Sequence, residues 1–574
     1  MLRSAPASRA LPRLLKRPSV PPSLGSPILR TIQSRSFALT ASSSPARDTA
    51  ELDTVTTLSN GIRVATEALP GHFSGLGVYV DAGSRYESDR LRGVSHIIDR
   101  LAFKSTKSRT SDKMVETMEG LGGNAQCASS RESIMYQAAV FNRDVDTMFG
   151  LLAETVRDPL ITEEEVVQQL DTAEYEISEI WAKPELILPE LLHNTAYKDN
   201  TLGNPLLCPK ERLDVINRDL IMEYREAMYR PERMVLAFAG VDHNTAVKLA
   251  EKYFGDMKGT LTSPMVSKSY PIPPPSRPSS PPGVLNKIPF FKSLSTTASA
   301  AASVLTSAST PSTPTSSSAP SNPFTQPSHY TGGLLSLPLC TTDASIHKPS
   351  FTHIQIGFEA FHIAHPDIFA LATLQTLLGG GGSFSAGGPG KGMYSRLFTQ
   401  VLNKYGWVDS CAAFNNTYTD SGLFGISASC TPNTGQALID VICRQLWFTF
   451  ASSGKGAISE SELARAKNQL RSSLLMNLES RMVELEDLGR QVQVFGRKIG
   501  AKEMCEKIQA VTMEDVRRVA EMVFTGKVRN VGGGEGGATI VVRAAGSEDE
   551  KRKMEGAEDM MKRWGLGRGA WATF

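Results

Sequence analysis

The residues that could do chemistry begin with one short segment, in which His96, Asp99 and Arg100 are spaced at i, i+3 and i+4. In a helix these positions lie on the same face. The inverted zinc motif H-x-x-E-H uses this spacing: two imidazoles bind zinc and a glutamate takes a proton from the zinc-bound water. Here Arg100, a permanent cation with no lone pair to donate, stands at the second ligand position. We therefore expect this segment to bind no zinc and to cleave no peptide.

A second candidate site is the glycine-rich segment from Gly379 to Gly392, in which eight of fourteen residues are glycine and none is β-branched. We expect no packed helix or strand there. Such a main chain has no side-chain barrier, so its N–H and C=O groups can lie against an extended peptide of any sequence. The candidate substrate-binding residues are Gly379, Gly380, Gly381, Gly382, Ser383, Phe384, Ser385, Ala386, Gly387, Gly388, Pro389, Gly390, Lys391 and Gly392.

Two other interpretations of the glycine segment are a phosphate-binding loop and an inert linker. A P-loop requires Gly, four residues and then Gly-Lys-Ser/Thr. Ser385 stands at the first glycine position and Gly392 follows Lys391, so the motif fails at both ends. The linker interpretation stays open. Helical apolar spacing on both sides, in residues 366–378 and 393–404, favours a loop inside a folded core.

The elements that must position these residues occur in two series of similar order. In the first series, strands are expected at 54–67 (a hairpin around Asn60-Gly61), 73–80, 132–140 and 233–239, and helices at 95–103, 111–121, 144–158, 162–182, 184–197, 218–228 and 244–254. In the second series, strands are expected at 351–358, 421–429 and 538–544, and helices at 459–495 and 512–524. The repeated order predicts an α+β fold with two homologous halves joined by a linker.

Composition places the boundaries between these parts. Residues 261–329 are rich in Pro, Ser, Thr and Ala, and no acidic residue occurs between Asp256 and Asp343. Such a stretch cannot bury enough apolar surface to fold, which predicts a disordered linker or insert. The N-terminal half is then expected at residues 48–260, with the degenerate zinc segment, and the C-terminal half at 330–546, with the glycine segment. Residues 547–574 are expected to form a charged C-terminal helix.

The first 47 residues contain eight Lys/Arg and no Asp or Glu, together with many Ser and Leu. This composition predicts a mitochondrial transit peptide, with a disordered basic tail as the alternative. With these eight removed from 61 basic residues, 53 remain against 59 acidic ones, a net charge of −6. Seven cysteines occur singly and without a CxxC pair, which indicates a reducing compartment. Nothing reaches the roughly 18 apolar residues of a membrane span.

Acidic residues gather in two places. Residues 161–192 contain nine acids and a single lysine: Glu163, Glu164, Glu165, Asp171, Glu174, Glu176, Glu179, Glu185 and Glu190 against Lys183. They could present a negative wall to arginine-rich peptides, or they could be a solvated helix face. Glu479, Glu484, Glu486 and Asp487 form a second group with the same two interpretations. His353, His362 and His365 match no metal-ligand spacing, and we expect them to be structural.

Read together, these segments make the chain resemble the pitrilysin-type metallopeptidases, and among them the processing-peptidase branch. The resemblance rests on the glycine segment with its exit at 393–397, on Ala82-Gly-Ser-Arg-Tyr-Glu87, on the degenerate segment at 93–104, and on residues 176–184 and 330–333. It covers residues 54–545.

The resemblance implies a non-catalytic chain that pairs with a zinc-carrying catalytic beta subunit in a heterodimer in the mitochondrial matrix. It also implies that the glycine segment binds the presequences of imported precursors. The third zinc ligand of the family would fall at Glu176, and with Arg100 facing it we expect an ion pair and no cofactor on this chain. No nucleic-acid partner and no membrane span are expected, and peripheral contact with the inner membrane stays open. The alternative function is a core subunit of the cytochrome bc1 complex, which shares the fold and the leader.

Overall fold

The computed structural model describes residues 53–198, 201–259, 324–338, 351–383, 392–454, 456–545 and 547–567. All of them belong to one compact unit, Asp48–Phe574. The expected transit peptide, residues 261–323 of the expected linker, residues 384–391 of the glycine segment and residues 568–574 lie outside the described part of the chain. Among the described helices, none combines the length and the apolar character needed to cross a bilayer.

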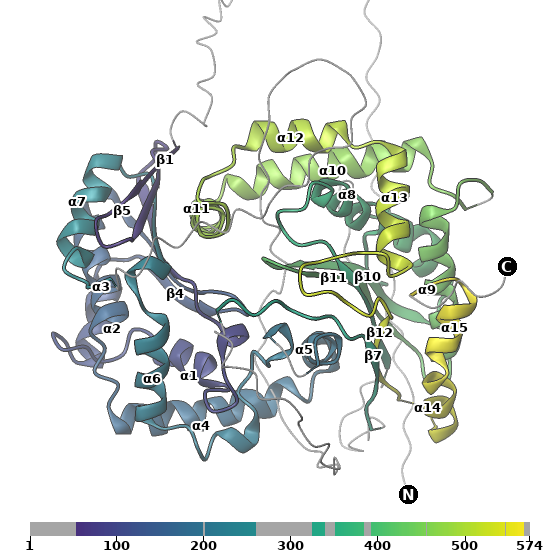
Figure 1. The fold of residues 1–574 in the computed structure, drawn as a ribbon, viewed down its shortest axis with the longest axis horizontal. Coiled ribbons are helices and arrows are strands. Elements are labelled where there is room, and N and C mark those ends of the chain that lie inside the picture. Colours follow the sequence, from purple (N-terminus) through teal and green to yellow (C-terminus); the bar gives the residue numbers. More distant parts are fainter. Residues whose placement is uncertain are drawn as a thin grey trace, which may run out of the picture. The chain divides into compact units, whose positions relative to one another are not determined.

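The N-terminal half is built on a six-stranded sheet with the order β1-β2-β6-β3-β5-β4 (Figure 1). Its strands are β1 (Asp53–Thr57), β2 (Arg63–Glu67), β3 (Phe73–Val80), β4 (Asn124–Ser129), β5 (Ile134–Phe141) and β6 (Met234–Ala239). The predicted hairpin is confirmed, because β1 and β2 pair antiparallel with Thr57 opposite Arg63. The edge strand β4 was not predicted, since its sequence NAQCAS has little apolar alternation.

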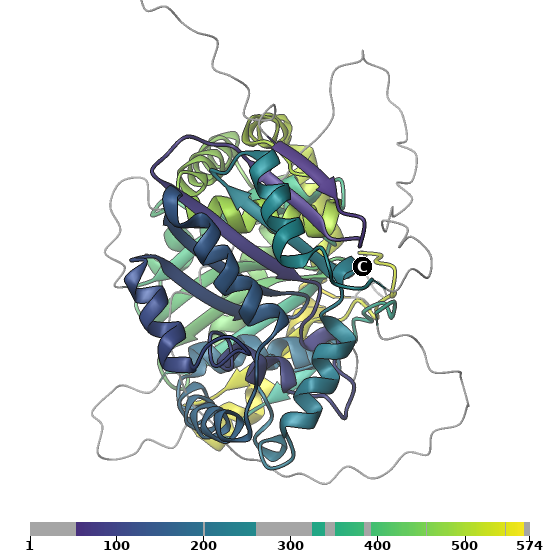
Figure 2. The same cartoon turned by 90° about the vertical axis from the view of Figure 1, so that its left-hand side faces the viewer.

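The helices of this half are α1 (Val94–Arg100), α2 (Ser111–Gly120), α3 (Val145–Arg157), α4 (Glu163–Ile180), α5 (Pro184–Ala196), α6 (Arg218–Met228) and α7 (His243–Phe254). Each lies where the sequence predicted a helix. The start of α4 is fixed by a capping box, in which Thr162 and Glu165 each accept a hydrogen bond from the other's backbone N–H. Seen from the side of this half, its blue and teal helices lie in front of its strands (Figure 2).

The C-terminal half repeats the plan with a six-stranded sheet of order β7-β12-β8-β11-β10-β9. Its strands are β7 (Gly333–Ser336), β8 (Thr352–Ala360), β9 (Gly380–Gly382), β10 (Val408–Thr417), β11 (Gly422–Cys430) and β12 (Thr539–Arg543). Its helices are α8 (Ile368–Leu378), α9 (Gly435–Phe450), α10 (Glu460–Leu478), α11 (Arg481–Phe495), α12 (Ala501–Ala510), α13 (Met513–Phe524), α14 (Glu548–Glu555) and α15 (Ala557–Arg563). A short π-helix spans Phe398–Leu402.

Three expectations about this half and its linker were wrong. The single helix predicted at 459–495 is two helices, because Ser480 is extended and separates α10 from α11. The single helix predicted in the tail is also two, α14 and α15, which meet at Gly556. The end of the expected linker is packed: Ser328 is fully buried, and the ring of Phe324 lies 4.0 Å from the guanidinium of Arg233.

Both faces of each sheet are covered, one by helices of the same half and the other by a helix from the other half. In β6, Leu236 and Phe238 pack among the helices of the N-terminal half, whereas Val235 and Ala237 pack with Leu488 of α11. The phenol of Tyr79 also donates to the carbonyl of Leu485 at 2.8 Å. The central strand β6 is therefore apolar on both faces and is buried over its whole length.

The exchange is reciprocal, since α5 of the N-terminal half covers the sheet of the C-terminal half. Leu188 and Leu192 of α5 share a buried cluster with Leu423 of β11 and Val541 of β12. The other face of that sheet, with Ile356 and Ile540, packs against the C-terminal half's own helices. In Figure 1 the labels α5 and α11 accordingly lie beside the strands of the opposite half.

Candidate functional site: a degenerate metal centre and a glycine-rich edge strand

The degenerate zinc segment lies on α1, whose start is held by a buried carboxylate. Glu87 accepts hydrogen bonds from the backbone N–H groups of Gly93 and Ser95, both at 2.7 Å. Burial raises the pKa of Glu87 to about 7, against the opposing effect of these two bonds. Gly93 itself has a φ of 88°, and a Cβ there would lie 2.9 Å from the Cα of Cys208. The last residue of the AGSRYE segment thus positions α1.

The predicted ion pair at the degenerate centre is confirmed. The Nε of Arg100 lies 3.1 Å from Glu176 Oε2 on α4, and His96 Nε2 lies 3.4 Å from the same oxygen. Partial burial would raise the pKa of Glu176, but the hydrogen bond to His96 and the charge of Arg100 together hold this pKa below its usual value. His96 and Arg100 thus meet at the same carboxylate oxygen, where the cation of Arg100 opposes the approach of a metal ion.

Asp99 does not join this group, although its spacing placed it on the same helix face. Its Oδ2 accepts hydrogen bonds from the backbone N–H and the hydroxyl of Ser129 on β4, at 3.0 and 3.1 Å. The carboxylate at the position of the general base is thus used to fasten α1 to the edge of the sheet. Within the described ranges, no group of three or more His, Cys, Asp or Glu side chains could hold a metal ion.

The chain purified without a partner is expected to contain no stoichiometric zinc after dialysis against a zinc-containing buffer. The physical reason is the cation of Arg100 next to Glu176, which repels a dication and donates no lone pair. Elemental analysis of the protein gives the measurement, and one zinc per chain would reverse this assignment. A double variant Asp99→Glu/Arg100→His provides the comparison, because it restores the H-x-x-E-H spacing.

The glycine segment begins as a strand, so the expectation that it forms none was wrong for its first residues. Gly380, Gly381 and Gly382 form β9, which pairs antiparallel with Ala412, Cys411 and Ser410 of β10. Glycine is required at the start: a Cβ on Gly380 would lie 2.0 Å from the carbonyl oxygen of Cys411, and its φ is 101°. Residues 379–383 and 392 of the candidate set are described, and the remaining eight are not.

The acidic residues at 161–192 are partly paired within the chain. Five of the nine have partners: Glu165 caps α4, Glu174 pairs with Lys210, Glu176 with Arg100, Glu179 with Lys183 and Glu190 with Arg131. In the second group, Glu484, Glu486 and Asp487 are buried on α11, where the first two pair with Arg481 and Arg490 and Asp487 accepts from Gln491. The second group is therefore mostly buried, whereas Glu163, Glu164 and Asp171 of the first group are exposed on α4.

The three histidines have different surroundings. His365 stacks on Phe361 with ring centroids 4.0 Å apart, and its Nδ1 accepts the backbone N–H of Asp367 at 3.1 Å. Burial lowers the pKa of His365 to about 4, and it also lowers the pKa values of His353 and His362. Neutral rings in packed surroundings agree with a structural role.

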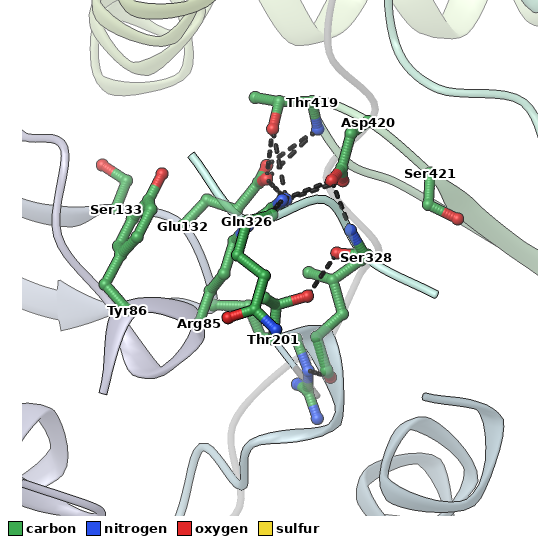
Figure 3. Close-up of polar contacts among 12 residues, drawn as sticks. Arg85, Tyr86, Glu132, Ser133, Thr201, Gln326, Ser328, Thr419, Asp420 and Ser421 are labelled. Atoms are coloured by element: carbon green, nitrogen blue, oxygen red, sulfur yellow. Dashed lines mark hydrogen bonds and ion pairs between the residues drawn. The ribbon is translucent and has the colours of Figure 1, made fainter. Parts of the chain in front are cut away.

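A buried polar network that the sequence did not predict joins the two halves (Figure 3). Arg85 donates to Glu132 Oε1 at 2.6 Å and to Asp420 Oδ1 at 2.7 Å. Thr419 donates to Glu132 through its backbone N–H (3.1 Å) and its hydroxyl (2.6 Å). Ser328 N–H donates to Asp420 at 2.7 Å. The sequence offered only the charged Arg85 in the AGSRYE segment, which gives no indication of its partners.

The charges in this network set one another's protonation. Burial would raise the pKa of Asp420, but the hydrogen bond and the charge of Arg85 hold it below its usual value. For Glu132 burial prevails over the same arginine, and the pKa of Glu132 is raised. The two carboxylates, one from each half, are therefore tied together by a single guanidinium.

Comparisons with known proteins agree with this picture. A sequence model described as Insulinase (Peptidase family M16) matches residues 63–210, and one described as Peptidase M16 inactive domain matches residues 216–315 and 317–470. The chain belongs to peptidase family M16. Its relatives in this family include the mitochondrial-processing peptidase subunit alpha of Neurospora crassa, 54% identical over 93% of this chain and 94% of that protein. The Homo sapiens subunit of the same name is 35% identical over 82% of this chain and 80% of that protein.

This M16 chain is accordingly a non-catalytic subunit of a metallopeptidase complex. The names of its relatives imply a mitochondrial protein. The predicted resemblance is confirmed at the level of family and subunit type.

Solved structures confirm the two-halved α+β fold. A protease from Helicobacter pylori superposes with a TM-score of 0.62 at 17% identity, covering 86% of this chain and 99% of that one. A chain of complex III2 from Candida albicans superposes with a TM-score of 0.61 at 18% identity, covering 87% and 99%. Because a peptidase and a respiratory complex give nearly equal scores, the fold alone does not separate the two functions considered for this M16 chain.

Proposed function

We propose that this chain is the substrate-recognising subunit of a mitochondrial processing peptidase. It binds the N-terminal presequences of imported precursors through the glycine segment Gly379–Gly392, and a catalytic beta subunit that carries zinc cleaves them in the mitochondrial matrix. The observation that carries this proposal is the Arg100–Glu176 pair at 3.1 Å, in which an arginine stands at the second ligand position of the zinc motif. A chain of a metallopeptidase family with this pair contributes binding, and a partner contributes hydrolysis.

The domain assignment follows the same proposal. Residues 1–47 are the transit peptide, 48–260 the N-terminal half, 261–329 a linker or insert, 330–546 the C-terminal half and 547–574 a C-terminal extension. The packed residues 324–329 belong with the core. Identity to processing-peptidase subunits at 54% favours this function over that of a bc1 core subunit. Co-purification of a tagged chain with a soluble zinc peptidase supports the proposal, and recovery in a membrane respiratory complex supports the alternative.

Deleting Ser383–Gly390 is expected to weaken binding of a basic presequence peptide by at least about tenfold, because main-chain contacts from the glycine segment are lost. This deletion spares Gly379 and Gly380, which are packed against Ser395 and β10. Fluorescence anisotropy with a labelled peptide, on the complex with its partner, measures the affinity.

A control variant replaces the same residues with an equal length of alternating Ser and Ala. It tests whether glycine itself is needed. The urea midpoint of each variant shows that the fold is kept. Unchanged peptide affinity in the deletion variant would remove the glycine segment from the proposed function.

A further inference from the structure

The two sheets differ in what lies at one edge. Each sheet has one parallel pair, β2–β6 and β7–β12. When the two strand orders are aligned on these pairs, β4 of the N-terminal sheet corresponds to β10 of the C-terminal sheet. The strand β4 is the last in its sheet, whereas β10 is followed by β9. The glycine segment has therefore added a strand at a sheet edge, and β9 is the edge strand in the described part of the chain.

The register fixes which main-chain groups of β9 face outward. Ala413 N–H donates to Gly379 C=O at 2.8 Å, and Ser383 N–H donates to Asp409 C=O at 2.6 Å. In antiparallel pairing alternate residues are bonded to the partner, so Gly381 faces β10 while Gly380 and Gly382 turn away from it. The N–H of Gly380 indeed donates elsewhere, to Ser395 Oγ at 3.0 Å. The outward groups are then the C=O of Gly380 and both groups of Gly382.

Gly379 and the three glycines of β9 differ in whether packing within the chain requires glycine at their positions. A Cβ on Gly379 would lie 2.4 Å from the Cβ of Ser395, and one on Gly380 would lie 2.0 Å from a backbone oxygen. Cβ atoms on Gly381 and Gly382 would meet nothing within 4 Å, and neither residue has a positive φ. Packing within the chain therefore explains why residues 379 and 380 are glycine. It does not explain why residues 381 and 382 are.

We propose that an extended stretch of the presequence adds to the outer edge of β9 as the next antiparallel or parallel strand, bonded to Gly382 and to the C=O of Gly380. This rests on the proposed function and specifies how the glycine segment binds. Main-chain bonds recognise a peptide without regard to its sequence.

Gly381 and Gly382 also leave space for the side chains of the bound peptide. Neighbouring side chains on adjacent strands stand about 4.5–5.5 Å apart, and successive residues face opposite sides of the sheet. Because Gly381 and Gly382 leave open space at their Cβ positions, long basic side chains of the peptide fit beside β9 on either face.

Gly382→Pro provides the test, because it removes the outward N–H of Gly382 while keeping the bonds from β9 to β10. Proline is tolerated on an edge strand when its nitrogen faces away from the sheet. The presequence peptide is expected to bind about fivefold more weakly to this variant in complex with the partner, the loss of one hydrogen bond. Gly382→Ala, which keeps the N–H and adds only a Cβ, is the matched comparison. It is expected to bind the peptide more tightly than Gly382→Pro, because the hydrogen bond to Gly382 N–H is retained.

A scan with singly N-methylated presequence peptides gives a second readout. A strand added to β9 predicts that methylation weakens binding at every second residue over a short stretch, where the peptide N–H donates to the C=O of Gly380 or Gly382. This alternation should persist in Gly382→Pro, which keeps both carbonyls. Wild-type affinity of Gly382→Pro, or a scan without alternation, would overturn strand addition. If the Ser383–Gly390 deletion still weakens binding in that case, the proposed function stands and only the mode of binding fails.

Discussion

Replacing Arg85 with alanine is expected to lower the free energy of unfolding by about 3–5 kcal/mol, because it leaves two buried carboxylates without their cation. Arg85 is 5% exposed at its side chain, as is Asp420, and Glu132 is 18% exposed. The network joins residues of both halves. Its loss therefore weakens the contact between the two halves. Equilibrium unfolding in urea measures the change.

The effect of Arg85→Ala should also depend on pH in a defined direction. Without the arginine, burial raises the folded-state pKa values of both Asp420 and Glu132 above their unfolded values. Groups of this kind stabilise the folded protein in acid, and that contribution is lost as the pH rises through the folded pKa. The penalty should therefore be larger at about pH 8 than at about pH 5.

The control for this experiment is Arg518→Ala. Arg518 also forms two bonds to one carboxylate, Asp367, both at 2.7 Å, but its side chain is 44% exposed. Exposed pairs contribute less than about 1 kcal/mol. Equal losses from the two arginines would show that the buried network does not hold the halves together.

The second large effect is expected at Leu488 of α11, where substitution by alanine should cost about 2–5 kcal/mol through lost burial and a residual cavity. Leu488 is fully buried in the cluster with Tyr79 and Val235 of the opposite half. Leu475→Ala on α10, at a side chain that is 46% exposed, is the matched control with an expected change within about 0.5 kcal/mol. Urea midpoints compare the two variants.

Proteolysis adds a local measurement to the Leu488 experiment. Loss of packing at Leu488 should raise cleavage between α10 and α11, around Ser480, relative to the Leu475 variant. If cleavage rises equally elsewhere in the chain, α11 is not the element whose attachment Leu488 secures.

Local signals in the sequence were sufficient for the helices of the N-terminal half, and the family resemblance was sufficient for the ion pair of the degenerate centre. Caps such as Thr162 with Glu165, and the apolar periodicity that follows, determine helix starts within a few residues. The pair between Arg100 and Glu176 could be expected because the resemblance placed both at one metal centre, and only one of them can bind a cation.

Other features depend on contacts far apart in the chain, and the sequence carries no local trace of them. The helix break at Ser480 is set by where α11 packs, on a sheet more than two hundred residues earlier. The strand β9 consists of glycines with no strand propensity, and it exists because the edge of β10 was available to it. Arg85 lies 335 residues from Asp420, and a charged residue does not by itself indicate so distant a partner.

The crossed placement of α5 and α11 has a consequence for how the polypeptide is made. While the ribosome is still synthesising the second half, the Tyr79 and Val235 face of the first sheet has no cover of its own and exposes apolar surface on the nascent chain. The first half therefore cannot finish folding until α11 has emerged. Once both halves are present, each covers the exposed sheet face of the other. Two co-expressed fragments divided within residues 261–323 should therefore associate without a covalent link.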